Sequence, residues 1–264
     1  MLDLTTGHDL RGPMSEPQVT AAVMIIGNEI LSGRTIDANL PFIAGELTKL
    51  GIRLMEARVV ADIEADIVAA VNALRARYTY LFTTGGIGPT HDDITAGSIA
   101  AAFGVAVHRH PDAVAILRRR YANPDDLTPG RLKMTEVPVG ATLIDNPVSG
   151  APGFKIDNVY VMAGIPAVAR AMFDGLKHGL KGGTPMASRT VVSNLGEGLI
   201  ATDLAALQER NPDVEIGSYP FHRRGVFGSS LVIRGTDPAR LEAVAEAVRD
   251  LVRRLGGTPT DEPA

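Results

Sequence analysis

The sequence has no cysteine and no tryptophan, and aromatic residues account for only 5% of its 264 residues. Without cysteine the protein can form no disulfide, zinc–thiolate site, iron–sulfur cluster or thiol nucleophile. The sequence also lacks any run of roughly 20 apolar residues, the length needed to cross a bilayer. We therefore expect a cytoplasmic protein with no membrane contact.

Positive charge is not in excess either. The formal net charge is −4, so no general attraction to nucleic acid is expected. The string "GVFG" (225–228) matches the glycine motif of a KH RNA-binding domain, but that motif joins two helices and this one lies between predicted strands. We therefore expect no nucleic-acid partner.

The content of hydrophobic residues, 45%, is ample for a buried core and fits one large domain, alone or with a small one. Residues 1–18 carry acids, glycine and proline without the apolar segment of a signal peptide. We expect them to form a flexible N-terminal extension.

From residue 19 onward, strand and helix patterns alternate. An apolar run at 19–27 ends in glycine, as in a strand buried on both faces. Apolar residues then recur at helical spacing from Ile36 to Leu50. The alternation continues with strands at 51–62, 78–84 and 159–164 and helices at 63–74, 92–103, 110–122 and 166–180. This order predicts an α/β domain over 19–180, with a parallel sheet wrapped by helices on both sides.

A second, smaller domain follows a short linker. The segment "KGGTP" (181–185) has two glycines, a proline and no apolar residue, which favours a linker. The patterns beyond it are a strand at 189–194, a helix at 198–210, strands at 213–219 and 226–234 and a helix at 238–255. They predict a small α+β domain over 187–257.

The stretch "TTGGIGPTHDDIT" (83–95) follows a predicted buried strand. In an open α/β sheet, ligands bind beyond the carboxyl ends of the strands. Gly85, Gly86 and Gly88 let the backbone approach a ligand, and a helix beginning near Asp92 or Asp93 offers unpaired N–H groups to an anion. The spacing fits neither a P-loop nor a dinucleotide-binding motif.

Asp92 and Asp93 have two explanations. Acidic residues stabilise the first turn of a helix, and one of them can be its N-cap. Alternatively, a carboxylate holds a hard divalent ion that bridges it to phosphate oxygens. Thr84, Thr90 and Thr95 are candidates for additional hydroxyl contacts.

Four separated motifs carry a family resemblance. They are "GNEILSGRTIDAN" (27–39), "TTGGIGPTHDDIT" (83–95), "NPVSGAPGF" (146–154) and "AGIPAVARAMF" (163–173). Over residues 20–180 the chain resembles the molybdopterin-binding (MoaB/Mog-like) family, and most closely the N-terminal region of CinA-type proteins; the same module is fused to eukaryotic FAD synthases. Residues 211–235 resemble the small domain that follows it. The chain ends before the amidase domain that many CinA proteins carry, so amidase activity is not implied.

The resemblance implies a three-layer fold and one of two chemistries. Molybdenum-cofactor proteins of this family bind a pterin phosphate, whereas CinA-like proteins are associated with metal-dependent cleavage of ADP-ribose-type pyrophosphates. By motif, Gly85, Gly86, Gly88, Pro89 and Thr90 form the phosphate-facing loop. Asp92 and Asp93 supply the catalytic and metal-binding carboxylates, with Mg²⁺, Mn²⁺ or Co²⁺ as the ion. The family also implies a homo-oligomer.

The first motif would bring Asn28, Glu29, Ser32 and Gly33 to the same edge of the sheet. The family often has aspartate at position 28, and an asparagine there offers a carbonyl to a metal but no charge and no general base. His91 stands where lysine is frequent, and a neutral imidazole would offset phosphate charge less well. Both departures bear on whether a bound phosphate is cleaved.

Other candidates have structural alternatives. Asp37 and Asn39 begin the first helix and suit a capping role, and Asp62 suits a cap for the next helix. The irregular loop Pro147–Gly153, with Gly150 and Pro152, predicts either a structural turn or a wall of the pocket. Gly164 and Pro166 close one strand and open a helix, which repeats the geometry that favours an anion.

The leading hypothesis is a metal-dependent pyrophosphohydrolase that acts on ADP-ribose-like or FAD-like nucleotides. The alternative is a protein that binds molybdopterin without cleaving it, and a third reading is a regulatory nucleotide sensor.

Overall fold

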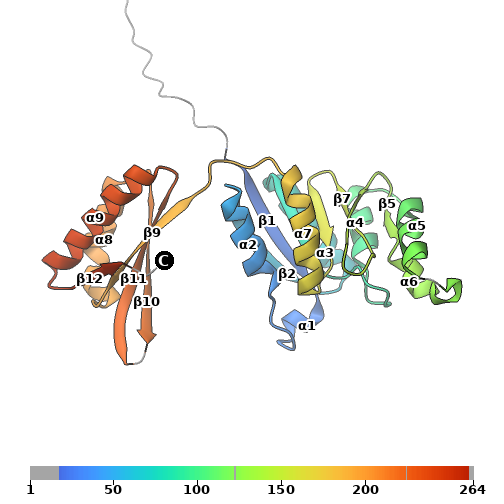
Figure 1. Cartoon of the computed structure of the whole chain (residues 1–264), viewed down its shortest axis with the longest axis horizontal. Helices are drawn as coiled ribbons and strands as arrows, with labels where there is room; N and C mark the ends of the chain where they lie inside the picture. The colour runs from blue at the N-terminus through green and yellow to red at the C-terminus, as the bar shows by residue number, and fades with distance from the viewer. Residues whose placement is uncertain (1–17, 122, 224, 262–264) are drawn as a thin grey trace, which may run out of the picture. The chain divides into compact units, whose positions relative to one another are not determined.

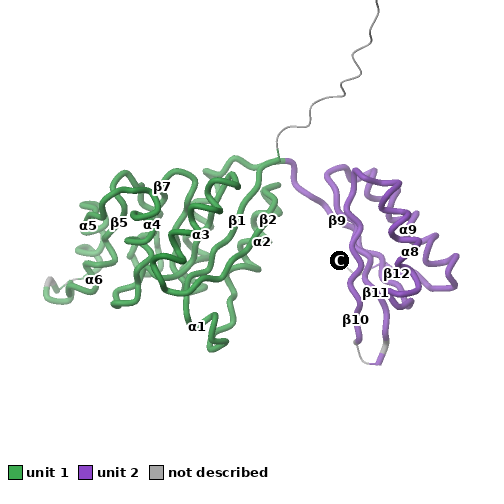
Figure 2. Tube along the Cα trace, turned by 180° about the vertical axis from the view of Figure 1, so that it is seen from behind, with its two compact units in different colours: residues 1–183 green, residues 184–264 purple. Residues whose placement is uncertain are grey.

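The computed structural model describes residues 18–121, 123–223 and 225–261. The chain divides into two compact units, Met1–Gly183 and Thr184–Ala264 (Figure 2). The boundary falls inside the predicted linker segment. The predicted N-terminal extension, 1–18, lies outside the described residues except for its last position.

A six-stranded sheet forms the centre of unit 1, in the order β2-β1-β3-β8-β7-β6. Its four parallel strands are β1 (Thr20–Ile26), β2 (Arg53–Val60), β3 (Tyr80–Thr84) and β8 (Val159–Met162). The predicted parallel sheet is therefore confirmed. Two antiparallel strands, β7 (Gly153–Ile156) and β6 (Thr142–Ile144), extend it beyond β8.

Helices cover both faces of this sheet, which gives three layers (Figure 1). Side chains of β1 alternate between two cores: Met24 and Ile26 point to one, and Val23 and Ile25 point to the other. The first core is covered by α3 (Glu64–Arg77) and α4 (Thr95–Phe103), and the second by α2 (Asn39–Lys49) and α7 (Pro166–Leu176). This arrangement confirms the three-layer fold.

Between α4 and β6 the chain forms a smaller substructure, of which the sequence patterns predicted the helix at 110–122 but not the strands. It contains a two-stranded antiparallel sheet of β4 (Val107–Arg109) and β5 (Glu136–Pro138). Three helical segments lie between these strands: α5 (Pro111–Arg120), the 3-10 turn η1 (Pro124–Asp126) and α6 (Pro129–Lys133). Two further short pieces are α1 (Asn28–Leu31) and the 3-10 turn η2 (Lys177–Gly179).

One predicted helix start and one predicted helix cap are wrong. Helix α4 begins at Thr95 rather than near Asp92, because the carboxylate of Asp93 accepts hydrogen bonds from Thr90 and so closes a separate turn before the helix. Asp62 does not cap α3, whose N-cap Ile63 makes no side-chain bond. The carboxylate of Asp62 instead accepts the backbone N–H of Asn28 at 2.8 Å.

Unit 2 is a four-stranded antiparallel sheet in the order β10-β11-β9-β12, with two helices. Its elements are β9 (Ala187–Ser193), α8 (Glu197–Arg210), β10 (Glu215–Arg223), β11 (Val226–Gly235), α9 (Pro238–Arg254) and β12 (Pro259–Asp261). Apolar side chains of α8 and α9 pack on Val191, Leu231 and Ile233 of the sheet. The glycine motif at 225–228 begins in the turn before β11 and continues into that strand, and it does not join two helices.

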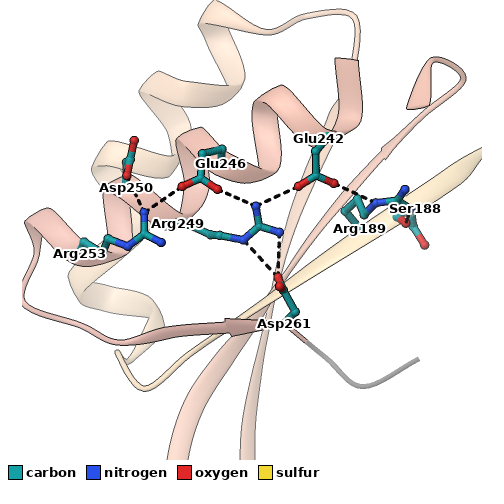
Figure 3. A network of polar contacts seen from close by, with 8 residues as sticks. All are labelled: Ser188, Arg189, Glu242, Glu246, Arg249, Asp250, Arg253 and Asp261. Carbon is teal, nitrogen blue, oxygen red and sulfur yellow. Dashed lines mark hydrogen bonds and ion pairs between the residues drawn. The ribbon is translucent and has the colours of Figure 1, made fainter. Parts of the chain in front are cut away.

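An ion-pair network joins α9 to the strands of unit 2 (Figure 3). The guanidinium of Arg249 contacts the carboxylates of Glu242, Glu246 and Asp261, at 3.0, 2.8 and 2.8 Å. Only 15% of the Arg249 side chain is exposed. Because Asp261 belongs to β12, the network fixes this last strand to the helix. Among the described helices of the chain, none is long and apolar enough to cross a membrane.

Candidate active site at the glycine loop

Three strand ends meet at Gly85, the residue that follows β3. Its backbone N–H donates to the carbonyl oxygen of Met162 in β8 at 3.1 Å. A Cβ atom on Gly85 would lie 2.1 Å from the carbonyl oxygen of Ile26 in β1, and Gly85 has φ +105°. A Cβ on Gly164, after β8, would lie 3.3 Å from the Cα of Gly85. Only glycine fits at position 85, so the three backbones form a close-packed frame.

This frame lies at a topological switch point of the sheet. The first long helix after β1 is α2, which covers one face, whereas the helix after β3 is α4, which covers the other. Ligands of open α/β sheets bind in such crevices, beyond the carboxyl ends of the strands. The loop predicted from the sequence therefore lies where the topology favours a ligand.

Thr95, the first residue of α4, holds the loop from inside. Its hydroxyl donates to the carbonyl oxygen of Gly85 at 3.0 Å, and its N–H donates to the carbonyl oxygen of Gly86 at 3.0 Å. A Cβ on Gly86, which has φ +67°, would lie 2.1 Å from the Thr95 hydroxyl oxygen. The buried side chain of Thr95 therefore stabilises the conformation of the loop.

The two aspartates have different surroundings. Oδ2 of Asp93 accepts the backbone N–H of Thr90 at 2.8 Å and its hydroxyl at 2.5 Å. The pKa of the Asp92 carboxyl is held below its ordinary value, first by the Thr90 hydroxyl and then by the Asp92 backbone N–H, with smaller contributions from His91 and Lys133. Thr90 has one hydroxyl proton, and its short bond directs that proton to Asp93. Both carboxylates therefore compete for a single donor.

A lysine that the sequence patterns did not single out also contacts this loop. Lys133, the last residue of α6, donates from Nζ to the Thr90 carbonyl oxygen at 2.5 Å. A second contact supports the approach of α6, because a Cβ on Gly130 would lie 3.0 Å from the carbonyl oxygen of Pro89. Lys133 lies in a stretch without periodicity, and no local pattern marks it as a site residue.

A pocket of about 290 Å³ opens beside the loop. Its apolar wall includes Ile87, Val107, Met134 and Phe154. Its charged residues are Glu64, Asp93, Lys133 and Glu136. Carboxylates therefore outnumber the one basic side chain of the lining.

The predicted site residues fall into three groups around this pocket. Gly86, Gly88, Asp93 and Pro152 line it. Thr84, Gly85 and Thr95 are buried beneath the loop, and the hydroxyl of Thr84 has no hydrogen-bond partner in the described structure. Pro89, Thr90, His91 and Asp92 lie exposed on the rim.

The first motif folds into α1 and the turn after it, at the carboxyl end of β1 but outside the pocket lining. The carboxylate of Glu29 folds back on Gly27, where a Cβ would lie 2.6 Å from it. The hydroxyl of Ser32 donates to the carbonyl oxygen of Glu29 at 3.3 Å, and Gly33 has φ +72°. Asn28, whose N–H binds Asp62, is exposed.

The capping residues predicted for the first helix have separate roles. Asp37 accepts the N–H of Leu40 at 2.8 Å and so caps α2. Asn39 is 3% exposed, and its Nδ2 donates to the carbonyl oxygen of Gly164 at 2.8 Å. This bond joins the segment after β1 to the turn after β8, next to Gly85.

The other two predicted turns are built differently. In the loop 147–153, the side chain of Asn146 donates to Ser149 and to the carbonyl oxygen of Ala151, at 2.6 and 2.7 Å. Gly150 has φ +79° and lies against Arg120. The loop is thus a structural turn whose Pro152 lines the pocket. Pro166 is at the first turn of α7, and both Pro166 and Gly164 are exposed outside the lining.

Among the described residues, no group of three or more His, Asp or Glu side chains forms a ready-made metal site. Magnesium often binds through only one or two protein carboxylates together with substrate phosphates. Asp92 and Asp93, next to an amide-rich loop, provide such a partial donor set. The donor chemistry fits an ion that binds together with a phosphate.

Comparison with known proteins agrees with the two-unit fold. The family model described as "probable molybdopterin binding domain" matches residues 22–181. The chain belongs to this family. A second family model, "FAD synthase, middle domain", matches residues 185–256. The resemblance predicted from the four motifs is confirmed.

Individual relatives cover different shares of the chain. A protein of Aeropyrum pernix is 32% identical over 94% of this chain and 98% of its own. A probable FAD synthase of Caenorhabditis elegans is 32% identical over 92% of this chain, which spans only 51% of that protein. The crystal structure of the protein CinA from Thermoplasma acidophilum, whose function is described as unknown, is 34% identical with a TM-score of 0.58, over 61% of this chain and 96% of that one.

Proposed function

We propose that this member of the molybdopterin-binding family binds a nucleotide through its phosphates and hydrolyses a phosphoanhydride bond with the help of a divalent cation. ADP-ribose and FAD are substrates of this chemical kind. The main support is that Gly86, Ile87 and Gly88 of the glycine loop line one pocket together with Asp93. The matches to FAD synthases support a ligand related to flavin nucleotides.

Each part of the site has a role in this proposal. The loop amides bind phosphate oxygens and stabilise the charge that develops on them as the bond breaks. Asp92 and Asp93 would hold the cation, which when bound would neutralise phosphate charge and polarise the phosphorus–oxygen bonds. The oxygen of a water molecule forms a bond to phosphorus and its protons pass to solvent, while the bridging phosphorus–oxygen bond breaks and leaves its electron pair on the departing phosphate oxygen. From ADP-ribose and one water, AMP and ribose 5-phosphate result.

The test is AMP release from ADP-ribose and from FAD, measured by chromatography with Mg²⁺, Mn²⁺ or Co²⁺ and with excess chelator. We expect metal-dependent release by the natural sequence and none above background for Asp93→Asn. Asp203→Asn, on an exposed position of α8, is the matched control. Equal AMP release by the natural sequence and Asp93→Asn would show that the proposed hydrolysis is wrong.

The second candidate is a protein that carries molybdopterin or a related pterin phosphate without cleaving it. Asn28 favours it, because an amide side chain supplies neither charge nor a general base at that position. Native mass spectrometry of freshly isolated protein separates the two functions. A retained pterin together with absent turnover supports the carrier, whereas turnover without a pterin supports the hydrolase. Homo-oligomer formation, which the family implies, can be measured on the same sample.

A further inference from the structure

The pocket beside the glycine loop presents a charge problem for a phosphate ligand. Glu64, Asp93 and Glu136 line it, and Asp92 lies on the rim. Glu136 is paired with Arg109, at 3.3 Å between the Arg109 Nε and the carboxylate. The remaining carboxylates would repel a phosphate unless positive charge is available inside the pocket.

Lys133 is the one basic residue of the described lining. Its ammonium group has three donors and no acceptor. One donor is used by the Thr90 carbonyl oxygen, which is a neutral partner, so the positive charge of Lys133 is not neutralised by this bond. No second partner for Nζ occurs in the described structure. Two donors therefore remain for a ligand, and no described carboxylate forms an ion pair with the ammonium group, although its charge contributes to the lowered pKa of Asp92.

The local structure holds this lysine against the loop. The Thr128 hydroxyl caps α6 by accepting the N–H of Arg131 at 3.3 Å. The guanidinium of Arg131 lies 4.2 Å from the centre of the Tyr121 ring. Gly130 leaves room for α6 to contact Pro89. These contacts hold the short helix α6 in place, and α6 positions Lys133 at the pocket.

We infer that Lys133 is a phosphate-binding residue of this site, which holds the glycine loop through the Thr90 carbonyl oxygen and offsets the charge of a phosphate bound by the loop. The inference rests on the proposed function only in requiring a phosphate ligand. It applies equally to a phosphate that is bound and not cleaved.

Two substitutions distinguish the effect of the Lys133 charge from the effect of its hydrogen bond to the glycine loop. Lys133→Gln removes the charge but keeps an N–H donor for the Thr90 carbonyl, whereas Lys133→Arg keeps the charge. Lys155→Gln is the matched control, because Lys155 lies on β7 outside the pocket lining, 5.2 Å from the Tyr160 ring centre. Thermal unfolding of each full-length variant verifies that it folds.

The probe is inorganic pyrophosphate with Mg²⁺, titrated into the protein in a calorimeter. We expect Lys133→Gln to weaken binding about tenfold or more, Lys133→Arg to retain most of the affinity and Lys155→Gln to bind as the natural sequence does. Added KCl should weaken binding less steeply in Lys133→Gln, because one charge contact is missing. A purely structural lysine would shift affinity by the same factor at every salt concentration.

Any of three results overturns the inference. They are unchanged pyrophosphate affinity in Lys133→Gln, the same salt dependence of binding in Lys133→Gln and the unsubstituted protein, and no binding of pyrophosphate by the unsubstituted protein at millimolar concentration. Loss of nucleotide hydrolysis has a separate meaning. If pyrophosphate binds with the expected variant pattern but no AMP is released from ADP-ribose or FAD, the proposed hydrolysis is wrong and the role of Lys133 stands.

Discussion

Thr90 donates two hydrogen bonds to a single oxygen of Asp93, its N–H at 2.8 Å and its hydroxyl at 2.5 Å, both to Oδ2. In the described structure no protein donor reaches the other oxygen, Oδ1. A carboxylate fixed through one oxygen and open at the other suits a cation, because its orientation is set before the ion arrives. The same two hydrogen bonds close a turn at residues 90–93, and α4 begins only after this turn, at Thr95.

Thr90→Val removes the hydroxyl donor and keeps the backbone N–H and the side-chain shape. We expect the affinity for Mg²⁺ in the presence of pyrophosphate to fall about two- to tenfold, because Asp93 is less well fixed. The pKa of the Asp92 carboxyl should rise toward its ordinary value, since Thr90 is the largest cause of its lowering. NMR titration of the carboxyl carbons and calorimetry measure both effects. Thr142→Val, at an exposed position of β6, should change neither.

Gly85→Ala should destabilise the protein by about 3 kcal/mol or more, because the added Cβ would collide with the backbone of β1 at a positive φ. Gly45→Ala is the control in α2, where an added Cβ meets nothing within 4 Å, and it should stabilise the helix by about 0.5–1 kcal/mol. Chemical denaturation of both full-length variants measures the free energies. Equal stability of the two variants would contradict the close-packed frame.

Asn39→Asp replaces the donor to the Gly164 carbonyl with a buried acceptor. We expect a loss of about 3 kcal/mol at pH 7. Burial beside a carbonyl raises the pKa of the introduced carboxyl in the folded state. The loss should therefore be smallest below about pH 4 and grow as the pH rises past the unfolded-state pKa. Denaturation at pH 4 and pH 7 tests this. Asn72→Asp, at an exposed position of α3, should have almost no effect.

Arg249→Met should lower the unfolding midpoint of unit 2 by about 4–8 °C at pH 7, because Arg249 is the centre of the α9 network. Arg254→Met is the control, since Arg254 makes no ion pair in the described part of the chain. Differential scanning calorimetry of the full chain follows the transition.

The effect of Arg249→Met should also depend on pH. Arg249, followed by Arg189, lowers the pKa of Glu242, and Arg253, followed by Arg249, lowers the pKa of Glu246. Groups with a lowered folded-state pKa stabilise the protein above their unfolded pKa, about 4.3, and lose this contribution as the pH falls through the folded pKa. The difference between natural sequence and variant should thus shrink from pH 5 to pH 3. A constant difference would show that packing, not ion pairing, is responsible.

The main sheet and its glycine loop were predictable because their signals are local. Buried parallel strands give continuous apolar runs such as 19–27, and the loop after β3 needs glycine where backbones touch. The loop 147–153 could be assigned only as a turn or a pocket wall, since the hydrogen bonds of Asn146 that form the turn do not depend on any periodic pattern.

The parts of the fold and site that could not be predicted depend on contacts between residues far apart in the sequence. Lys133 reaches Thr90 across 43 positions, and Asp62 reaches Asn28 across 34. An aspartate that follows a strand commonly caps the next helix, so the local pattern predicted a cap at Asp62. In the fold, the Asp62 carboxylate instead accepts the N–H of Asn28 at the start of α1. Strands β6 and β7 are only three and four residues long, too short for alternation to distinguish them from loops.

The contact of Ile26, Gly85 and Gly164 also bears on how ligand preference can change among members of this family. A side chain added at Gly85 would collide with the backbone of β1, so this position offers no variation for selection to act upon. The pocket beside the loop is lined in part by ordinary side chains, among them Val107, Met134 and Phe154. Under the proposed function, libraries confined to these three positions should alter which nucleotide or pterin is bound, whereas the binding of the phosphate by the loop should stay unchanged.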